Sequence, residues 1–301
     1  MTVTISIGSG KGGTGKTTVS ANLALLLART GRKVCLVDLD IGGADAHILF
    51  GLFEPKKTLT DFLTRKVNTI AAVAHTFYSF NGLQLVPGTG DTLQTANMTY
   101  QEKQRLLRAL AKLEVDVVLI DTGAGTSYHA LDFFMHSDIQ ICVTQPDPTS
   151  IMDFYTFLQL ATIRKVLGSF LSQSEVGVTL KRHNFKTLSE VIELAEKTQE
   201  GAKEKVQQAL KYFHPLLIIN RDTPNSGVNK TKLKKMIAKY LGIDVPELGE
   251  IPDDTHINQA LKAYMPVSEL YPSAPSSLAL QKIADKVDQI VDLFNNHSSP
   301  Q

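Results

Sequence analysis

The residues with the clearest chemistry lie near the start of the chain, where positions 10–18 are GKGGTGKTT. They fit the spacing G-x-x-x-x-G-K-[ST] of a phosphate-binding loop. Glycines let backbone N–H groups turn onto phosphate oxygens, the lysine reaches the outer phosphates, and the threonine hydroxyl can bind Mg²⁺. The pattern predicts a site for a nucleoside triphosphate and its metal. The expected nucleotide contacts are Gly10, Lys11, Gly12, Gly13, Thr14, Gly15, Lys16, Thr17 and Thr18.

The flanking sequence supplies the elements that such a loop needs. An apolar run at 3–7 predicts a buried strand before it, and apolar residues at helical spacing follow it. The overlapping residues 8–13, GSGKGG, also spell G-x-G-x-x-G, and Asp38 ends the next apolar run, as in a dinucleotide-binding fold. That alternative gives Lys16 and Thr17 no task, so the phosphate loop is the favoured interpretation.

Carboxylates follow two further apolar runs. Asp38 and Asp40 come after the run at 34–37, and Asp121 ends the run at 117–120. Carboxylates at the ends of parallel strands can hold Mg²⁺, partly through water, and can orient a nucleophile. We therefore expect a metal site at Thr17, Asp38, Asp40 and Asp121. The alternative for Asp38 or Asp40 is that it caps the following turn.

Lys11 lies five residues before Lys16, and an ordinary phosphate loop has no use for it. The segment 11–18, KGGTGKTT, resembles the deviant phosphate loop of the MinD/ParA ATPases. The resemblance implies that ATP is the nucleotide and that two chains form a dimer around it. It also implies that Lys11 acts across the interface on the partner's nucleotide. The alternative is a solvated loop lysine.

Two further segments carry the same resemblance. Residues 38–45, DLDIGGAD, are similar to the family's first switch, in which Asp40 matches the carboxylate that positions the attacking water. Residues 121–126, DTGAGT, are similar to the second switch, whose glycines let the backbone rearrange as the γ-phosphate leaves. The catalytic residues implied are Lys11, Lys16 and Asp40. The overall spacing looks closest to the MinD/FlhG branch.

The expected contacts with the base come from two late segments. Asn220-Arg221 and Pro252-Asp253 each follow an apolar run, and both resemble the family's adenine-binding turns. An Asn amide can pair with adenine through one donor and one acceptor. Loop capping is the alternative for both segments.

Composition places these motifs in one α/β domain covering 1–301. The chain has 301 residues, 43% hydrophobic content and a net charge of +1. Apolar strands alternate with helical patterns, which predicts a doubly wound, mostly parallel sheet with helices on both faces. The expected strands lie at 3–7, 34–37, 83–86, 117–120, 139–143, 216–219 and 248–251.

Several segments fall outside this nucleotide-binding pattern. A polar stretch at about 169–212 predicts a helical insertion, which either binds a partner or is an extension without one. The tail 297–301 is expected to be disordered. Cys35 and Cys142 lie in apolar strands without C-x-x-C spacing, so we expect buried thiols in a reducing cytoplasm and set a cluster-carrying role aside. No apolar run reaches transmembrane length and no signal peptide is evident.

The resemblance implies a slow ATPase switch that an activating protein partner stimulates and that positions a cellular component, at the nucleoid or the membrane. Membrane binding is the less favoured of these alternatives, because the amphipathic segment 276–295 carries acidic side chains on its polar face. We expect this segment to form a final helix that packs on the sheet. FlhG relatives carry an extension before the first strand, which this sequence lacks, so a flagellar role is less expected. A scaffold with little hydrolysis is the alternative from another class.

Nonspecific DNA contact is a further expected output. A cluster of lysines after Asn220 resembles the basic surface by which ParA-like dimers hold DNA, and a solvated lysine face is the alternative. These lysines are Lys230, Lys232, Lys234, Lys235 and Lys239.

Overall fold

The computed structural model describes residues 2–40, 43–88, 98–224 and 228–297. Within them an eight-stranded sheet has the order β3-β4-β2-β5-β1-β6-β7-β8. All neighbours pair in parallel except β3 and β4. The strands are β1 (Val3–Gly8), β2 (Val34–Leu39), β3 (His75–Phe77), β4 (Leu83–Val86), β5 (Val117–Thr122), β6 (Ile139–Thr144), β7 (Leu216–Asp222) and β8 (Glu247–Pro252). The expected doubly wound, mostly parallel sheet is confirmed.

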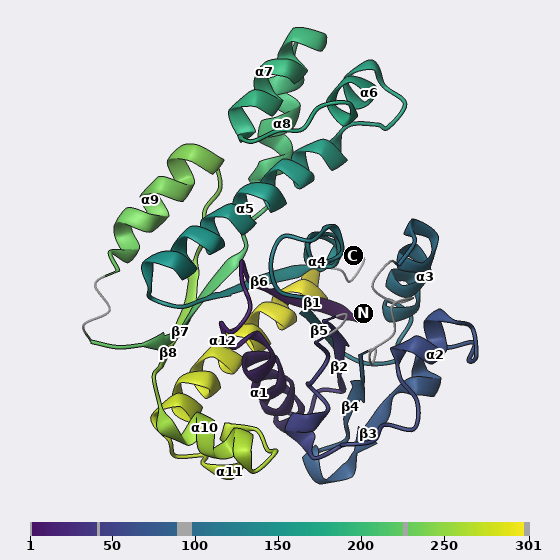
Figure 1. Ribbon diagram of the computed structural model, residues 1–301, viewed down its shortest axis with the longest axis vertical. Helices are drawn as coiled ribbons and strands as arrows, with labels where there is room; N and C mark the ends of the chain where they lie inside the picture. The colour runs from purple at the N-terminus through teal and green to yellow at the C-terminus, as the bar shows by residue number, and fades with distance from the viewer. Residues whose placement is uncertain (1, 41–42, 89–97, 225–227, 298–301) are drawn as a thin grey trace.

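Helices cover both faces of this sheet (Figure 1). The helix α1 packs on β1, β2 and β5, and α12 packs on β1 and β8, whereas α4 contacts β1 and β5, and α5 contacts β6. The helices are α1 (Lys16–Arg29), α2 (Leu59–Leu63), α3 (Tyr100–Leu110), α4 (Tyr128–His136), α5 (Pro148–Ser169), α6 (Glu175–Lys181), α7 (Leu188–Thr198), α8 (Ala202–Lys211), α9 (Lys230–Leu241), α10 (Thr255–Lys262), α11 (Val267–Leu270) and α12 (Pro275–His297).

Side-chain alternation divides the core between the two faces. In β2, Val34 and Leu36 belong to the apolar cluster under α1 and α12, whereas Cys35 and Val37 belong to a cluster that includes α3 residues. Successive residues of a strand point to opposite faces, and a parallel sheet is buried on both. The seven strands expected from apolar runs are therefore confirmed. The antiparallel β3 was not expected, because its three residues HTF form no apolar run and none is fully buried.

The segment from 169 to 212 is helical. In Figure 1, α6, α7 and α8 stand together at one end of the molecule, beyond the sheet and beside the C-terminal end of α5. Val176, Val191 and Val206, one from each helix, are at most 1% exposed and share an apolar cluster with α5. The segment therefore shares one apolar core with the face of the sheet that α5 covers.

The last helix closes the opposite face. Leu280, Ile283, Val287 and Val291 of α12 are at most 1% exposed and lie in the cluster with α1 and β8. Its acidic face binds Arg32, which donates to Asp288 and Asp292. These four residues of the apolar stripe are therefore covered by the chain itself and do not face outward. No helix in the described part of the chain could span a membrane. Residues 298–301 of the expected tail lie outside the described residues.

Candidate nucleotide-binding site

The loop that joins β1 to α1 has the backbone of an anion cradle. Gly13 and Gly15 adopt φ values of 78° and 90°, in the left-handed region that glycine occupies at no steric cost. No side chain caps the first turn of α1, which begins at Lys16. Uncapped N–H groups at a helix N-terminus, together with the positive end of its dipole, are a ready site for phosphate.

Neighbouring elements approach this loop too closely for any side chain at two of its glycines. A Cβ on Gly10 would lie 2.1 Å from the carbonyl oxygen of Asp153 in α5. A Cβ on Gly15 would lie 2.2 Å from the Nδ2 of Asn220, at the end of β7. Packing against the α5 backbone therefore requires glycine at Gly10, whereas Gly15 is also favoured by its φ of 90°, and α5 and β7 help to shape the loop.

Two amide side chains hold the loop by donating hydrogen bonds to its backbone carbonyl oxygens. Asn220 is 4% exposed and donates from Nδ2 to the carbonyl oxygen of Thr14 at 2.8 Å. Gln145, just after β6, donates from Nε2 to the carbonyl oxygen of Gly13 at 2.9 Å. The sequence placed Asn220 at the adenine and missed Gln145. Gln145 follows the carboxyl end of a parallel strand, where ligands of such sheets bind, and this position could have indicated its role.

Two buried carboxylates lie beside the cradle. Asp38 and Asp121 face each other in the register of β2 and β5 and are 1% and 0% exposed. Asp121 Oδ1 accepts a hydrogen bond from Ser20 Oγ at 3.1 Å, and the Thr17 side chain lies close enough to lower its pKa. Burial raises the pKa of both carboxyls. At Asp38 the negative charge of Asp121 raises the pKa further. A cation at this edge would relieve the cost of burying both charges.

These residues fit a magnesium ion. Asp121 Oδ2 is buried and has no hydrogen-bond partner among the described residues. Thr17 stands next to it, as the first turn of α1 requires. No group of three or more His, Cys, Asp or Glu side chains gathers as a metal cluster in the described ranges. Mg²⁺ binds in such sites through one or two carboxylates and takes its other oxygens from phosphate and water.

The first switch is shaped by Asp38 as well. Its two carboxylate oxygens accept from the backbone N–H groups of Asp40 at 3.0 Å and Ala46 at 3.1 Å, so it caps the turn that follows β2. Asp40 is partly exposed, and a Cβ on Gly123 would lie 3.4 Å from its Oδ1. The Asp40 carboxylate thus lies where the two switch segments meet. Residues 41–42 lie outside the described residues.

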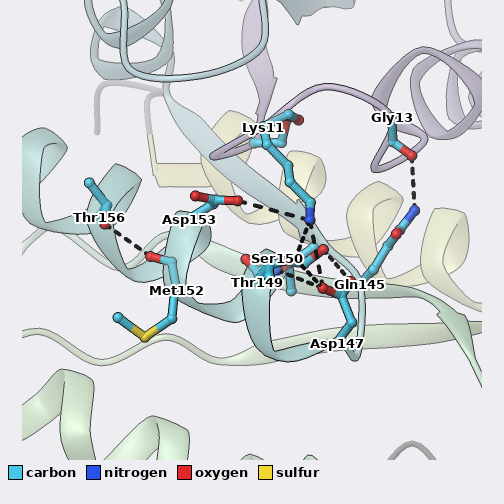
Figure 2. Close-up of polar contacts among 11 residues, drawn as sticks. Lys11, Gly13, Gln145, Asp147, Thr149, Ser150, Met152, Asp153 and Thr156 are labelled. Atoms are coloured by element: carbon cyan, nitrogen blue, oxygen red, sulfur yellow. Dashed lines mark hydrogen bonds and ion pairs between the residues drawn. The ribbon is translucent and has the colours of Figure 1, made fainter.

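Lys11 folds back onto the start of α5 (Figure 2). Its Nζ donates to Thr149 Oγ1 at 2.8 Å and lies 3.6 Å from Asp147 Oδ1 and 3.9 Å from Asp153 Oδ2. The sequence did not indicate these intrachain partners of Lys11. The reason is topological: β6 is the neighbour of β1, so the helix after β6 begins beside the loop after β1. The action of Lys11 across a dimer interface stays a prediction.

The remaining expected base contacts lie at the same edge. Arg221 is exposed and has a φ of 55°, and Pro252 is the last residue of β8. Asp253 is exposed, and its backbone N–H donates to the carbonyl oxygen of Asp222 at 3.0 Å. Asp254, not Asp253, caps α10. Arg221 and Asp253 therefore remain accessible to a ligand, and their contact with the base stays a prediction.

The lysines of α9 form a weaker basic surface than the sequence suggested. Lys230 pairs with Glu250, and Lys234 pairs with Glu247 at 3.2 Å. These acidic partners come from β8, the strand that follows α9, and the lysine cluster was considered without them. The lysines that remain exposed are Lys232, Lys235 and Lys239.

A phosphate loop between a parallel strand and a buried helix, with carboxylates at the ends of the neighbouring strands, defines the class of P-loop NTPases. The chain belongs to the ParA family of this class. The matching family model is described as "NUBPL iron-transfer P-loop NTPase" and covers residues 1–168. Members of the ParA/MinD family are P-loop ATPases.

Named relatives cover most of the chain. The antiactivator FleN of Pseudomonas aeruginosa is 28% identical, over 94% of this chain and 85% of FleN. The flagellum site-determining protein YlxH of Helicobacter pylori is 30% identical, over 73% of this chain and 76% of YlxH. The solved structure of the septum site-determining protein MinD of Pyrococcus horikoshii, complexed with Mg-ADP, has a TM-score of 0.69 and 25% identity, covering 97% and 98% of the two chains.

The two cysteines lie away from any cluster-binding arrangement. Cys35 and Cys142 are both fully buried, in β2 and β6. Burial raises the pKa of the Cys35 thiol to about 12 and raises that of Cys142 as well. Metal clusters are bound by thiolates, which burial disfavours here. These two cysteines are therefore poor candidates to bind the iron that the family description mentions.

Proposed function

We propose that this protein is an ATP-dependent switch that dimerises with ATP, hydrolyses it to ADP and phosphate, and positions a cellular component. The observation that carries the proposal is the uncapped, glycine-shaped cradle before Lys16, set beside the buried and unpartnered Asp121 Oδ2. A triphosphate supplies negative charge for the cradle, and its magnesium ion supplies the cation that Asp121 lacks.

Each site residue then has one task. Lys16 contacts the outer phosphates, and Thr17 and Asp121 hold Mg²⁺, which neutralises charge on the phosphates when it is bound. Asp38 shapes the first switch and adds negative charge near the metal. Asp40 positions the water that attacks the γ-phosphate. Lys11 leaves α5 and reaches the nucleotide of the partner chain.

The proposed role of the switch is to set where a cellular component lies. One relative is named for determining the flagellar site and one structural neighbour for determining the septum site. We infer that this chain likewise acts from the cytoplasm on a cell surface or the nucleoid, under the control of an activating protein partner. The similarity to YlxH supports a flagellar role as one alternative, although such a role was less expected from the sequence. Contact with DNA would use the lysines of α9 that stay unpaired, Lys232 and Lys235 among them.

The alternative is a nucleotide-binding scaffold with little hydrolysis. It shares the cradle and the metal site but gives Asp40 no catalytic task. Turnover separates the two: the switch requires an ATPase rate that falls in Asp40→Ala by roughly a hundredfold or more, the range for losing a positioned base. A slow rate that survives Asp40→Ala would support the scaffold.

The binding site itself is tested by Lys16→Ala. We expect ATP affinity to fall at least about tenfold, because a charge-assisted hydrogen bond to phosphate contributes about 1.5–3 kcal/mol. Isothermal titration calorimetry with Mg-ATP measures the change, and circular dichroism checks that the fold persists. Lys112→Ala, at an exposed lysine of another surface, is the matched control. Equal affinities in wild type and Lys16→Ala would contradict the assignment of the loop.

A further inference from the structure

A second hollow lies apart from the nucleotide cradle. It has a volume of about 800 Å³ and is walled by α4, the C-terminal end of α5, and residues of α6 and α8. None of the loop residues from 9 to 18 lines it. Its apolar lining includes Met135, Leu167, Phe170 and Ala209. We call this hollow the α4–α8 groove.

Exposed tyrosines mark the groove as a contact surface. Tyr100, from the start of α3, is 71% exposed, and Tyr212, just after α8, is 78% exposed. Phe170 lies between α5 and α6 and is 6% exposed. Tyrosine is enriched in protein interfaces and among the residues that dominate binding energy, because it offers a large rigid surface with one polar end. An apolar lining with exposed tyrosines suits a protein segment.

The charge of the groove is positive. Arg164, Lys165 and Lys181 line it. Its single acidic side chain, Asp132, already binds Arg164 and the buried Lys103. The groove therefore presents cations that lack a matching acid within the lining, and electrostatic complementarity favours an acidic occupant.

Two helices connect this groove to the nucleotide site. The helix α4 begins at its cap Ser127, directly after the second switch, whose Gly125 N–H donates to the carbonyl oxygen of Ser9 in the phosphate loop at 3.0 Å. The helix α5 begins at the residues that hold Lys11 and, at about 1.5 Å per residue, runs roughly 33 Å to the groove. Both walls therefore start beside the nucleotide.

We propose that the α4–α8 groove docks a segment of a partner protein in which carboxylates flank aliphatic or aromatic side chains, and that the nucleotide state sets its affinity through α4 and α5. The second half rests on the proposed function. The segment buries its apolar side chains against Met135 and Leu167, which line the groove and are partly exposed, and its carboxylates pair with Lys165 and Lys181. The helices from 175 to 211 thereby gain a task, as one wall of a partner site.

The test is a selection of random displayed peptides on the full chain, with the winners then measured by fluorescence anisotropy. We expect recovered peptides to be acidic and apolar. Tyr212→Ala and Lys181→Glu should each weaken binding by on the order of tenfold or more, as truncation of a central contact does. Both residues are exposed, so their replacement leaves the fold intact. The matched controls are Tyr78→Ala and Lys112→Glu, at exposed positions outside the groove, which should change binding less than about twofold.

Peptides that bind Tyr212→Ala and Lys181→Glu as tightly as wild type, or that bind equally well after their acids become amides, overturn the proposal. So does duplex DNA that binds this groove in place of any peptide. A tenfold or larger change in peptide affinity between ATP and ADP supports the link to the switch, and identical affinities overturn that link. ATP hydrolysis in the same samples keeps the outcomes separate: peptide binding that Tyr212→Ala and Lys181→Glu leave unchanged, in samples that hydrolyse ATP, rejects this inference and leaves the proposed function standing.

Discussion

Lys11 is the residue on which the account depends most at the scale of single side chains. In the isolated chain it is held by Thr149, Asp147 and Asp153, yet its side chain keeps 32% of its exposure. Ion pairs this exposed are worth roughly 0.2–1 kcal/mol. Such a restraint is weak enough to be exchanged for a triphosphate across a dimer interface.

Asp153→Ala should therefore strengthen ATP-dependent dimerisation, by up to about fivefold, since it removes one intrachain partner of Lys11 and at most about 1 kcal/mol. Sedimentation velocity in an Asp40→Ala background, with Mg-ATP, measures the dimer constant. Asp244→Ala, at an exposed aspartate on another surface, is the control. A dimer that weakens in Asp153→Ala would mean that α5 helps Lys11 to reach its partner.

Asn220 allows a similarly sharp test. If its only task is to hold Thr14, Asn220→Ala loosens the loop and lowers ATP and GTP affinity by the same factor, up to about tenfold for one lost hydrogen bond. If it also reads adenine, ATP affinity falls more than GTP affinity. We expect equal losses, because its buried amide is already engaged by the loop backbone. Parallel titrations with the two nucleotides decide, and a selective loss for ATP would restore the base contact.

At the scale of elements, Asp132 joins three helices. It lies on α4 and accepts hydrogen bonds from Lys103 of α3 and Arg164 of α5. Asp132→Asn should reduce the free energy of unfolding by about 3 kcal/mol at neutral pH, because Lys103 is left buried without its counter-charge. Urea unfolding measures this loss, and Asp244→Asn should change stability by less than about 0.5 kcal/mol.

The same pair gives the expected pH dependence. Burial opposes the charge on Asp132, but the hydrogen bonds from Arg164 and Lys103 outweigh it and lower its pKa. A carboxyl whose pKa is depressed on folding stabilises the fold fully above its unfolded pKa, near 3.9, and loses this as pH falls through the folded value. The difference between wild type and Asp132→Asn should therefore shrink below about pH 4. A difference that stays constant with pH would show that the charge of Asp132 is not the cause.

The elements also show where sequence reasoning is strong. Runs rich in apolar residues predicted seven strands, because most strands of a parallel sheet are buried on both faces. The edge strand β3 was not predicted, because it is short and half-buried. At the site, the local spacing of Gly10 to Thr17 specified the loop. Its supports did not follow from spacing, because Gln145 and Asp153 reach the loop only through the order of strands in the sheet.

For the whole molecule, the sheet gathers the ends of β1, β2, β5, β6 and β7 at one edge, and the switch segments and α5 start there. The helices at 175–211 stand at the far end of α5. This arrangement suits a protein that converts the presence of a γ-phosphate into a change of partner. In the function proposed here, dimerisation is the first step of that conversion, so it carries the central claim.

The most direct test is the mass of Asp40→Ala in solution by light scattering with Mg-ATP and with Mg-ADP. We expect about twice the 33.0 kDa of one chain with ATP and a single chain with ADP. Adding Lys11→Ala should return the ATP sample to a single chain, whereas Lys112→Ala should leave the dimer unchanged. One mass under every nucleotide condition, whether of one chain or of two, would contradict the account of an ATP-driven switch.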